Sequence, residues 1–388
     1  MGPLDGVRVI EVAGIGPGPF AAMMLSDMGA EVIRIDRVRE SPQRPQTPTR
    51  YALVNRGRRS VAIDLKVGAG IDVVMRLVLK ADVLIEGFRP GVMERLGLGP
   101  EELRRQNARL IYGRATGWGQ TGPLAHAAGH DINYIALSGA LHAIGRSSGP
   151  PTVPLNLLGD FAGGGLYLAY GIVCALVERA KSGLGQVIDA AMVDGVASLA
   201  TAFFGMIASG QWSDQRGENL LDGGSPWYDV YQTSDGKYVA IGAIEPVFYE
   251  QLLVAAGLND SGLPDQHDRS GWPLIRERLT DVFRMRTRDE WTALLEGTDV
   301  CFAPVLGFHE ASAHRHLVAR GTLTTSNGVT QPAPAPRFDR STATIQGPPP
   351  ERGQHTHEVL QDWGFSADEI EVLELEQTIG ATSPRFGE

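Results

Sequence analysis

The chain has very little cysteine and no run of apolar residues that predicts a membrane span. Only Cys174 and Cys301 occur in 388 residues. Both lie among apolar neighbours and far apart, so we expect buried, reduced thiols rather than a disulfide framework. The apolar run Leu166 to Val177 is shorter than the ~20 residues of a spanning helix. No basic stretch with an apolar core opens the chain. We therefore expect a cytoplasmic protein without membrane association.

Positive charge is also scarce over the whole sequence. The net charge of −10 at pH 7 argues against nucleic acid as the main partner. The exception is Arg34 to Arg59, where eight arginines stand against two acidic residues and give +6. Such a cluster suits a small polyanion, because a guanidinium matches the geometry of phosphate. The alternative is a solvated loop, since residues 39–50 are rich in Pro and Gln.

Several catalytic motifs are absent. No His-Glu-x-x-His or Cys-x-x-Cys pattern occurs, so we expect no metal and no redox cofactor. No Gly-x-Ser-x-Gly elbow occurs, which argues against the commonest serine hydrolases. The run Gly14 to Gly18 resembles a dinucleotide fingerprint, but Pro19 occupies the place of its third glycine. Its prolines also remove amides that a pyrophosphate needs. We expect this loop to let the backbone approach another ligand closely.

Alternating strand and helix patterns predict an α/β fold. Strand-like runs such as 7–12, 31–36 and 83–86 are separated by helix-like segments, which is typical of a parallel sheet covered by helices. The length predicts more than one domain. We predict a large Rossmann-like domain over residues 1–200 and a small α+β domain over 225–315. Residues 330–388 are expected to return to the large domain.

Three residues have the chemistry of acid–base catalysis. His130 lies in a glycine-rich loop, and imidazole titrates near the working pH. Asp160 precedes an apolar helix predicted over 161–181, so it either caps that helix or serves as an acid or base. Glu245 ends an apolar strand and is followed by proline.

Longer motifs give a stronger indication, because the sequence resembles the family III CoA transferases and, among them, the α-methylacyl-CoA racemases. The resemblance covers nearly the whole chain. It is carried by the motifs Gly14-Ile15-Gly16-Pro17-Gly18-Pro19, Asn55-Arg56-Gly57-Arg58-Arg59-Ser60, Glu86-Gly87-Phe88-Arg89-Pro90-Gly91, Gly129-His130-Asp131-Ile132-Asn133-Tyr134, Gly159-Asp160-Phe161-Ala162-Gly163-Gly164 and Gly242-Ala243-Ile244-Glu245-Pro246.

The resemblance implies an interlocked homodimer with active sites between the large domain of one subunit and the small domain of the other. His130, supported by Glu245, would face Asp160, and the pair would move the α-proton of an acyl-CoA through an enolate. Matching site positions are Asp131, Asn156 and Tyr228. The implied CoA-binding positions are Arg37, Arg56, Arg58, Arg59, Arg89, Gly129 and Tyr134. CoA would be part of the substrate, in an enzyme of fatty-acid and lipid metabolism.

A CoA transferase of the same family is the main alternative. There Asp160 would be a nucleophile that attacks the thioester. His130 together with Glu245 favours the racemase, because a transferase needs no paired proton shuttle. A CoA-binding protein without activity is a third alternative. The loop Val38 to Thr49 matches no pattern of the family.

Overall fold

The computed structural model describes residues 1–39 and 48–380, and the chain divides into two compact units. The first unit contains the described residues of Met1–Ser138, Leu155–Leu199 and Val318–Glu388. The second contains Gly139–Pro154 and Ala200–Leu317. Residues 139–154, which the sequence analysis assigned to the large domain, thus belong to the second unit.

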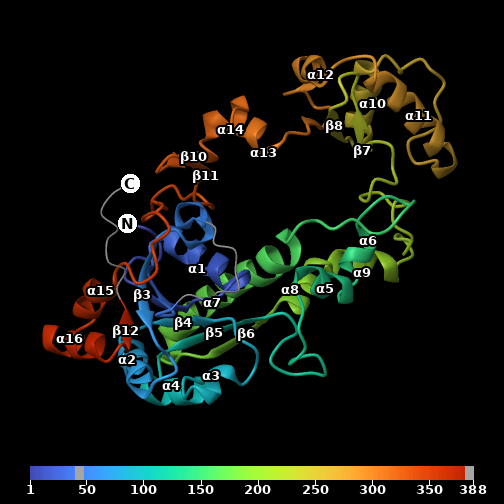
Figure 1. Ribbon diagram of the computed structural model, residues 1–388. Coiled ribbons are helices and arrows are strands. Elements are labelled where there is room, and N and C mark those ends of the chain that lie inside the picture. The colour runs from blue at the N-terminus through green and yellow to red at the C-terminus, as the bar shows by residue number, and fades with distance from the viewer. Residues whose placement is uncertain (40–47, 381–388) are drawn as a thin grey trace. The chain divides into compact units, whose positions relative to one another are not determined.

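A seven-stranded sheet forms the centre of the first unit (Figure 1). Its strand order is β12-β3-β2-β1-β4-β5-β6, and only β12 pairs antiparallel to its neighbour. The strands are β1 (Arg8–Val12), β2 (Glu31–Asp36), β3 (Arg58–Ile63), β4 (Val83–Glu86), β5 (Ile111–Thr116), β6 (Val187–Ala191) and β12 (Ile379–Gly380). The predicted α/β class with a large parallel sheet is confirmed.

Helices cover both faces of this sheet because both faces are apolar. On one face, buried residues of β1 and β4 pack against α1 (Pro17–Asp27) and α7 (Tyr167–Ser182). On the other face lie α2 (Gly68–Val78), α3 (Val92–Arg95), α4 (Pro100–Gln106), α15 (Thr356–Asp362) and α16 (Ala367–Leu375). Also in this unit are α5 (Asp131–Leu137), α8 (Met192–Leu199), β10 (Leu323–Ser326) and β11 (Val329–Pro332), and α14 (Arg315–Arg320) spans the boundary between the units.

The second unit is built on a small antiparallel sheet in the order β7-β8-β9. These strands are β7 (Tyr228–Gln232), β8 (Tyr238–Gly242) and β9 (Phe302–Pro304). A turn with Gly236 at φ 76° joins the first two strands, as its composition predicts. The unit's helices are α6 (Ala140–Ala143), α9 (Thr201–Ala208), α10 (Pro246–Ala255), α11 (Trp272–Phe283), α12 (Arg288–Leu295) and α13 (Phe308–Ala311).

The segment Leu157–Ser182 is one continuous helical stretch of 26 residues, longer than the helix predicted over 161–181. Its first ten residues, Leu157–Leu166, form a π-helix that runs into α7, so Asp160 lies inside a helix rather than at its N-cap. By length and composition this stretch could cross a membrane, although the apolar run Leu166 to Val177 alone is too short, and the expected lack of membrane association stays a prediction. One such helix is weak evidence, because a core helix of a globular protein passes the same test.

The two thiols were expected to be buried, and this expectation is wrong. Cys174 on α7 and Cys301 before β9 are both exposed. The reason for Cys174 is that the chain leaves one apolar stripe of its helix uncovered. On this stripe Leu166, Tyr170 and Val177 have exposed fractions of 43%, 66% and 57%.

Candidate active site

The loops at the carboxyl ends of the parallel strands bring together several residues that the sequence singles out. The strand order reverses at β1 and β4, and ligands of such sheets bind outside the carboxyl ends near this point. The loop Ala13–Gly16 follows β1 there, and the chain that leads to His130 follows β5. The π-helix that carries Asp160 contacts both α1 and α5.

Asp160 is held through its backbone and through one carboxyl oxygen. The backbone N–H of Asp160 donates to Oδ2 of Asp131 at 2.7 Å. The carboxyl Oδ2 of Asp160 accepts a hydrogen bond from Nδ2 of Asn156 at 3.0 Å. Gly159 is required next to it, because a Cβ there would lie 2.5 Å from Oδ2 of Asp131. The carboxyl of Asp160 is therefore fixed in place while its Oδ1 has no hydrogen-bond partner among the described residues.

The surroundings of Asp160 raise its pKa above the ordinary value of an aspartic acid. Burial is the largest effect and raises the pKa of Asp160, and the negative charge of Asp131 raises it further. The hydrogen bond from Asn156 and the positive charge of His130 act in the opposite direction, and the net result is a raised pKa. A raised pKa lets a carboxyl group keep its proton to higher pH and makes the carboxylate a stronger base, which suits an acid–base catalyst.

His130 is the N-cap residue of α5 and belongs to the same unit as Asp160. Its backbone N–H donates to Oδ1 of Asn133 at 3.0 Å, which orders the start of the helix. The residue is exposed, and its charge acts on the carboxyl of Asp160. An imidazole and a carboxyl group therefore share one neighbourhood at this edge of the sheet.

Tyr134 of α5 is a buried aromatic residue close enough to Asp160 to be affected by its charge. Its ring packs edge-on against Trp118 at 4.7 Å, and a Cβ at Gly129 would lie 2.8 Å from it. Burial raises the pKa of Tyr134, the charges of Asp160 and Asp131 raise it further, and Arg89 lowers it. Arg89 is exposed and has no acceptor among the described residues, so its guanidinium is available near the site.

The arginines of the basic segment have different environments. Arg37 follows β2, is exposed, and has no acceptor among the described residues. Arg56 is buried and pairs with Asp27 at 2.6 Å, whereas Arg58 is buried and pairs with Glu11 at 3.0 Å. Arg44 lies outside the described residues. Because the guanidinium groups of Arg56 and Arg58 are occupied, only the backbone near them is left to contact a ligand.

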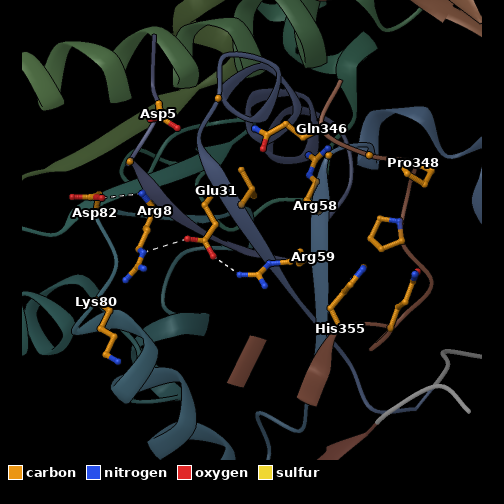
Figure 2. A pocket seen from close by; sticks show the side chains of 17 residues that line it. Asp5, Arg8, Glu31, Arg58, Arg59, Lys80, Asp82, Gln346, Pro348 and His355 are labelled. Atoms are coloured by element: carbon orange, nitrogen blue, oxygen red, sulfur yellow. Dashed lines mark hydrogen bonds and ion pairs between the residues drawn. The ribbon is translucent and has the colours of Figure 1, made fainter. Parts of the chain in front are cut away.

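Arg59 lies at the amino edge of the sheet, away from the loops that carry His130 and Asp160. It lines a cavity of about 850 Å³ and pairs there with Glu31, which also pairs with Arg8 at 3.2 Å (Figure 2). Its other acceptors are Glu358 at 3.0 Å and Asp362 at 2.6 Å. Its charge is thus compensated by carboxylates of its own chain.

Two predicted site residues belong to the second unit. Glu245 is the N-cap residue of α10, and Tyr228 begins β7. Both are exposed, and their roles beside His130 stay predictions. In residues 1–39 and 48–380 no group of three or more His, Cys, Asp or Glu side chains lies close enough to hold a metal ion.

Comparisons with known proteins agree on one family. The family model "CoA-transferase family III" matches residues 4–356. The chain is 47% identical to the "Alpha-methylacyl-CoA racemase" of Mus musculus and 46% identical to that of Homo sapiens, with 97% of each chain covered. It is 32% identical to the "Succinyl-CoA:glutarate CoA-transferase" of Mus musculus, over 93% of this chain and 86% of that protein. The crystal structure of a CAIB/BAIF family protein from Brucella suis superposes with a TM-score of 0.78 at 27% identity, covering 93% and 99% of the two chains.

Proposed function

This chain belongs to CoA-transferase family III, and on that premise we propose that it is a racemase that interconverts (R)- and (S)-2-methylacyl-CoA thioesters. The proposal is supported by the position of His130 and Asp160 in one unit, close enough for the charge of His130 to act on the carboxyl of Asp160, whose pKa is raised. Two acid–base groups that act on opposite faces of the α-carbon suit a 1,1-proton transfer. The relatives named as racemases are also more similar to the chain than the succinyl-CoA:glutarate transferase, at 46–47% against 32% identity.

In the proposed reaction each group handles the proton on one face of the α-carbon. Neutral His130 takes the α-proton of the S epimer and becomes an imidazolium, and the electron pair moves into the enolate of the thioester. The carboxylic acid of Asp160 then donates its proton to the opposite face and becomes a carboxylate. The R epimer returns by the same steps in reverse, and proton exchange with water resets the enzyme.

The remaining predicted site residues have supporting parts in this proposal. Glu245 of a second copy orients the imidazole of His130, and Tyr228 of that copy closes the same site. Arg37 and Arg89 bind the phosphates of CoA, because their guanidinium groups have no acceptor among the described residues. Gly129 and Tyr134 line the thioester end. The side chains of Arg56, Arg58 and Arg59 stabilise the fold through their ion pairs. The backbone of the turn near Arg56 and Arg58 contacts the substrate.

The second copy is part of the proposal because α7 leaves an apolar stripe uncovered. Leu166, Tyr170, Val173 and Val177 follow helical spacing, and each is at least 38% exposed. Contact with an identical stripe removes this surface from water. Light scattering coupled to gel filtration should give a dimer, and Tyr170→Glu should weaken it, whereas Leu375→Glu on exposed α16 should not. A monomeric protein that floats with liposomes would overturn this part.

The proposal also names a compartment and a metabolic role. Two exposed thiols without a disulfide suit the reducing cytoplasm, and a 2-methylacyl-CoA substrate assigns the enzyme to fatty-acid and lipid metabolism. Fractionation of cells that express the native protein tests the first statement, and recovery in the membrane or periplasmic fraction would contradict it.

Deuterium exchange distinguishes the racemase from the transferase. A single epimer of a 2-methylacyl-CoA is incubated with the protein in deuterium oxide, without any free acid, and the α-position is followed by NMR. Deuterium at the α-carbon together with the other epimer is the expected result. If the α-proton stays and CoA moves only after a free carboxylic acid is added, Asp160 is a nucleophile and the racemase proposal is wrong.

A further inference from the structure

Gln266 is a buried residue of the second unit whose side chain binds the backbone directly before Glu245. Its exposed fraction is 6%. Its Nε2 donates to the carbonyl oxygen of Ala243 at 3.2 Å and to that of Ile244 at 2.9 Å. The two acceptors are 23 and 22 residues away in the sequence, and together they use both hydrogens of the amide nitrogen. One side chain therefore holds the two residues that lead into Glu245.

These carbonyl groups need a donor because strand β8 ends at Gly242. Beyond the strand, the N–H of Ala243 still donates to the carbonyl oxygen of Trp227 at 2.9 Å, but the carbonyls of residues 243 and 244 accept from Gln266 and not from a strand. A buried carbonyl that lacks a donor is unfavourable. Gln266 therefore replaces the sheet where the chain turns toward α10.

Gln266 is itself held in place. Its backbone carbonyl accepts from Nε1 of Trp272 at 3.0 Å, and the ring of Trp272 packs edge-on against buried Trp227 at 5.3 Å. On the other side of Glu245, its own carbonyl accepts from the N–H of Tyr249 at 3.0 Å as α10 begins. The backbone is thus fixed both before and after Glu245, while the side chain of Glu245 is exposed.

We propose that Gln266 is a positioning residue that places the carboxylate of Glu245 for its contact with His130. The inference rests on the proposed racemase function, in which Glu245 of a second copy orients the imidazole, and deepens it. A group that orients a catalytic base must be held to within about 0.5 Å, and a displacement of about 1 Å can cost roughly a hundredfold in rate. Gln266 acts through Glu245 and does not itself touch the substrate.

The test compares the two epimers of a 2-methylacyl-CoA in one variant. Gln266→Met removes both hydrogen bonds and keeps the length of the side chain. The loss of the α-proton in deuterium oxide is followed by NMR, separately for the S epimer, whose proton goes to His130, and for the R epimer, whose proton goes to Asp160. The rate for S relative to R should fall by about tenfold or more, because only His130 depends on Glu245. This ratio is independent of the fraction of the variant that is folded.

Three further variants test whether Gln266 acts through Glu245. Glu245→Gln should lower the same ratio, and adding Gln266→Met to it should change the ratio by less than about twofold, because the positioned carboxylate is already gone. Gln232→Met is the matched control. Nε2 of exposed Gln232 donates to the carbonyl oxygen of Gly236 at 3.5 Å in the same unit, so its loss should leave the ratio unchanged.

Several outcomes would overturn the inference. They are equal slowing of both epimers by Gln266→Met, no slowing of either, an unchanged ratio in Glu245→Gln, and a further large loss when the two substitutions are combined. If Gln266→Met does not fold, Trp272→Phe replaces it, because it removes the donor to the backbone of Gln266 and should lower the ratio in the same way. An unchanged ratio in Trp272→Phe would then reject the role of Gln266.

The same experiment separates this inference from the proposed function. If the unaltered protein exchanges the α-proton of neither epimer, the proposed function itself has failed. An unchanged ratio in an active Gln266→Met protein rejects only the role of Gln266.

Discussion

Removing the amide of Asn156 should change the pH dependence of catalysis in a direction that the contacts of Asp160 determine. Nδ2 of Asn156 donates to Oδ2 of Asp160 at 3.0 Å and lowers the pKa of that carboxyl. In Asn156→Ala the ionised carboxylate loses this donor, and its pKa rises. The pair of His130 and Asp160 must carry one proton between them to act, so kcat/KM is bell-shaped against pH. We assign the acid side of the bell to Asp160, and that side moves to higher pH.

The size of the effect follows from the strength of one hydrogen bond to a charged group. Such bonds contribute about 1.5–3 kcal/mol, and the exposure of Asn156 favours the lower end because water replaces the amide. About 1.5 kcal/mol corresponds to roughly a tenfold loss of kcat/KM at a fixed pH on the acid side. Near the optimum, the loss is smaller, because the pair already carries a single proton there.

The assay measures how fast one 2-methylacyl-CoA epimer is converted into the other. It is repeated over the whole pH range in which the protein is stable. Ser182→Ala is a suitable control, because it removes an exposed hydrogen bond from Oγ to Oε2 of Glu178 at 3.1 Å in the same unit. The control should superpose on the unaltered profile. If Asn156→Ala leaves the acid side in place, or moves it to lower pH, the account of how Asp160 is tuned is wrong.

Three further predictions follow from the contacts of individual residues. Asp131→Asn removes a negative charge that raises the pKa of Asp160, so the acid side of the same profile should move to lower pH, opposite to Asn156→Ala; a shift to higher pH would contradict this. Arg56→Met leaves the buried carboxylate of Asp27 without its partner and should lower the free energy of unfolding in urea by about 3–5 kcal/mol. A loss below ~1 kcal/mol would show that the pair is not a structural element. Arg89→Gln should raise KM for acyl-CoA about tenfold and leave the unfolding free energy within ~0.5 kcal/mol; an unchanged KM would remove Arg89 from the CoA site.

Much of the first unit can be predicted from its sequence, because the apolar pattern of each segment agrees with the burial of that segment in the folded chain. The apolar runs at β1, β2 and β4 are buried on both faces, and proline and glycine mark the ends of the helices between them. Asp160 shows where this agreement ends. The apolar pattern around it indicates a helix but does not distinguish the wide turns of a π-helix from an ordinary start, so the pattern suggested a cap.

The basic segment shows a second limit. Counting charges indicates an anion site, but the partners Asp27 and Glu11 of Arg56 and Arg58 come from other strands and helices, and no local pattern announces them. The close approach of Gly16 to the carboxyl of Asp160 has the same origin, because the two residues are 144 positions apart and meet only when α1 and the π-helix pack together. The family motifs point to both residues without giving the contact.

The most direct test of the two-base proposal removes one of the two catalytic groups at a time. In deuterium oxide, Asp160→Asn should still exchange the α-proton of the S epimer through His130 and return it as the S epimer, because asparagine cannot deliver a proton to the other face. His130→Ala should exchange the α-proton of the R epimer only, through Asp160, and return it as the R epimer. The predicted result is that each variant exchanges the α-proton of only one epimer and returns that epimer with its configuration unchanged. Formation of the opposite epimer by either variant at the rate of the unaltered protein would contradict the assignment of His130 and Asp160 to the two faces.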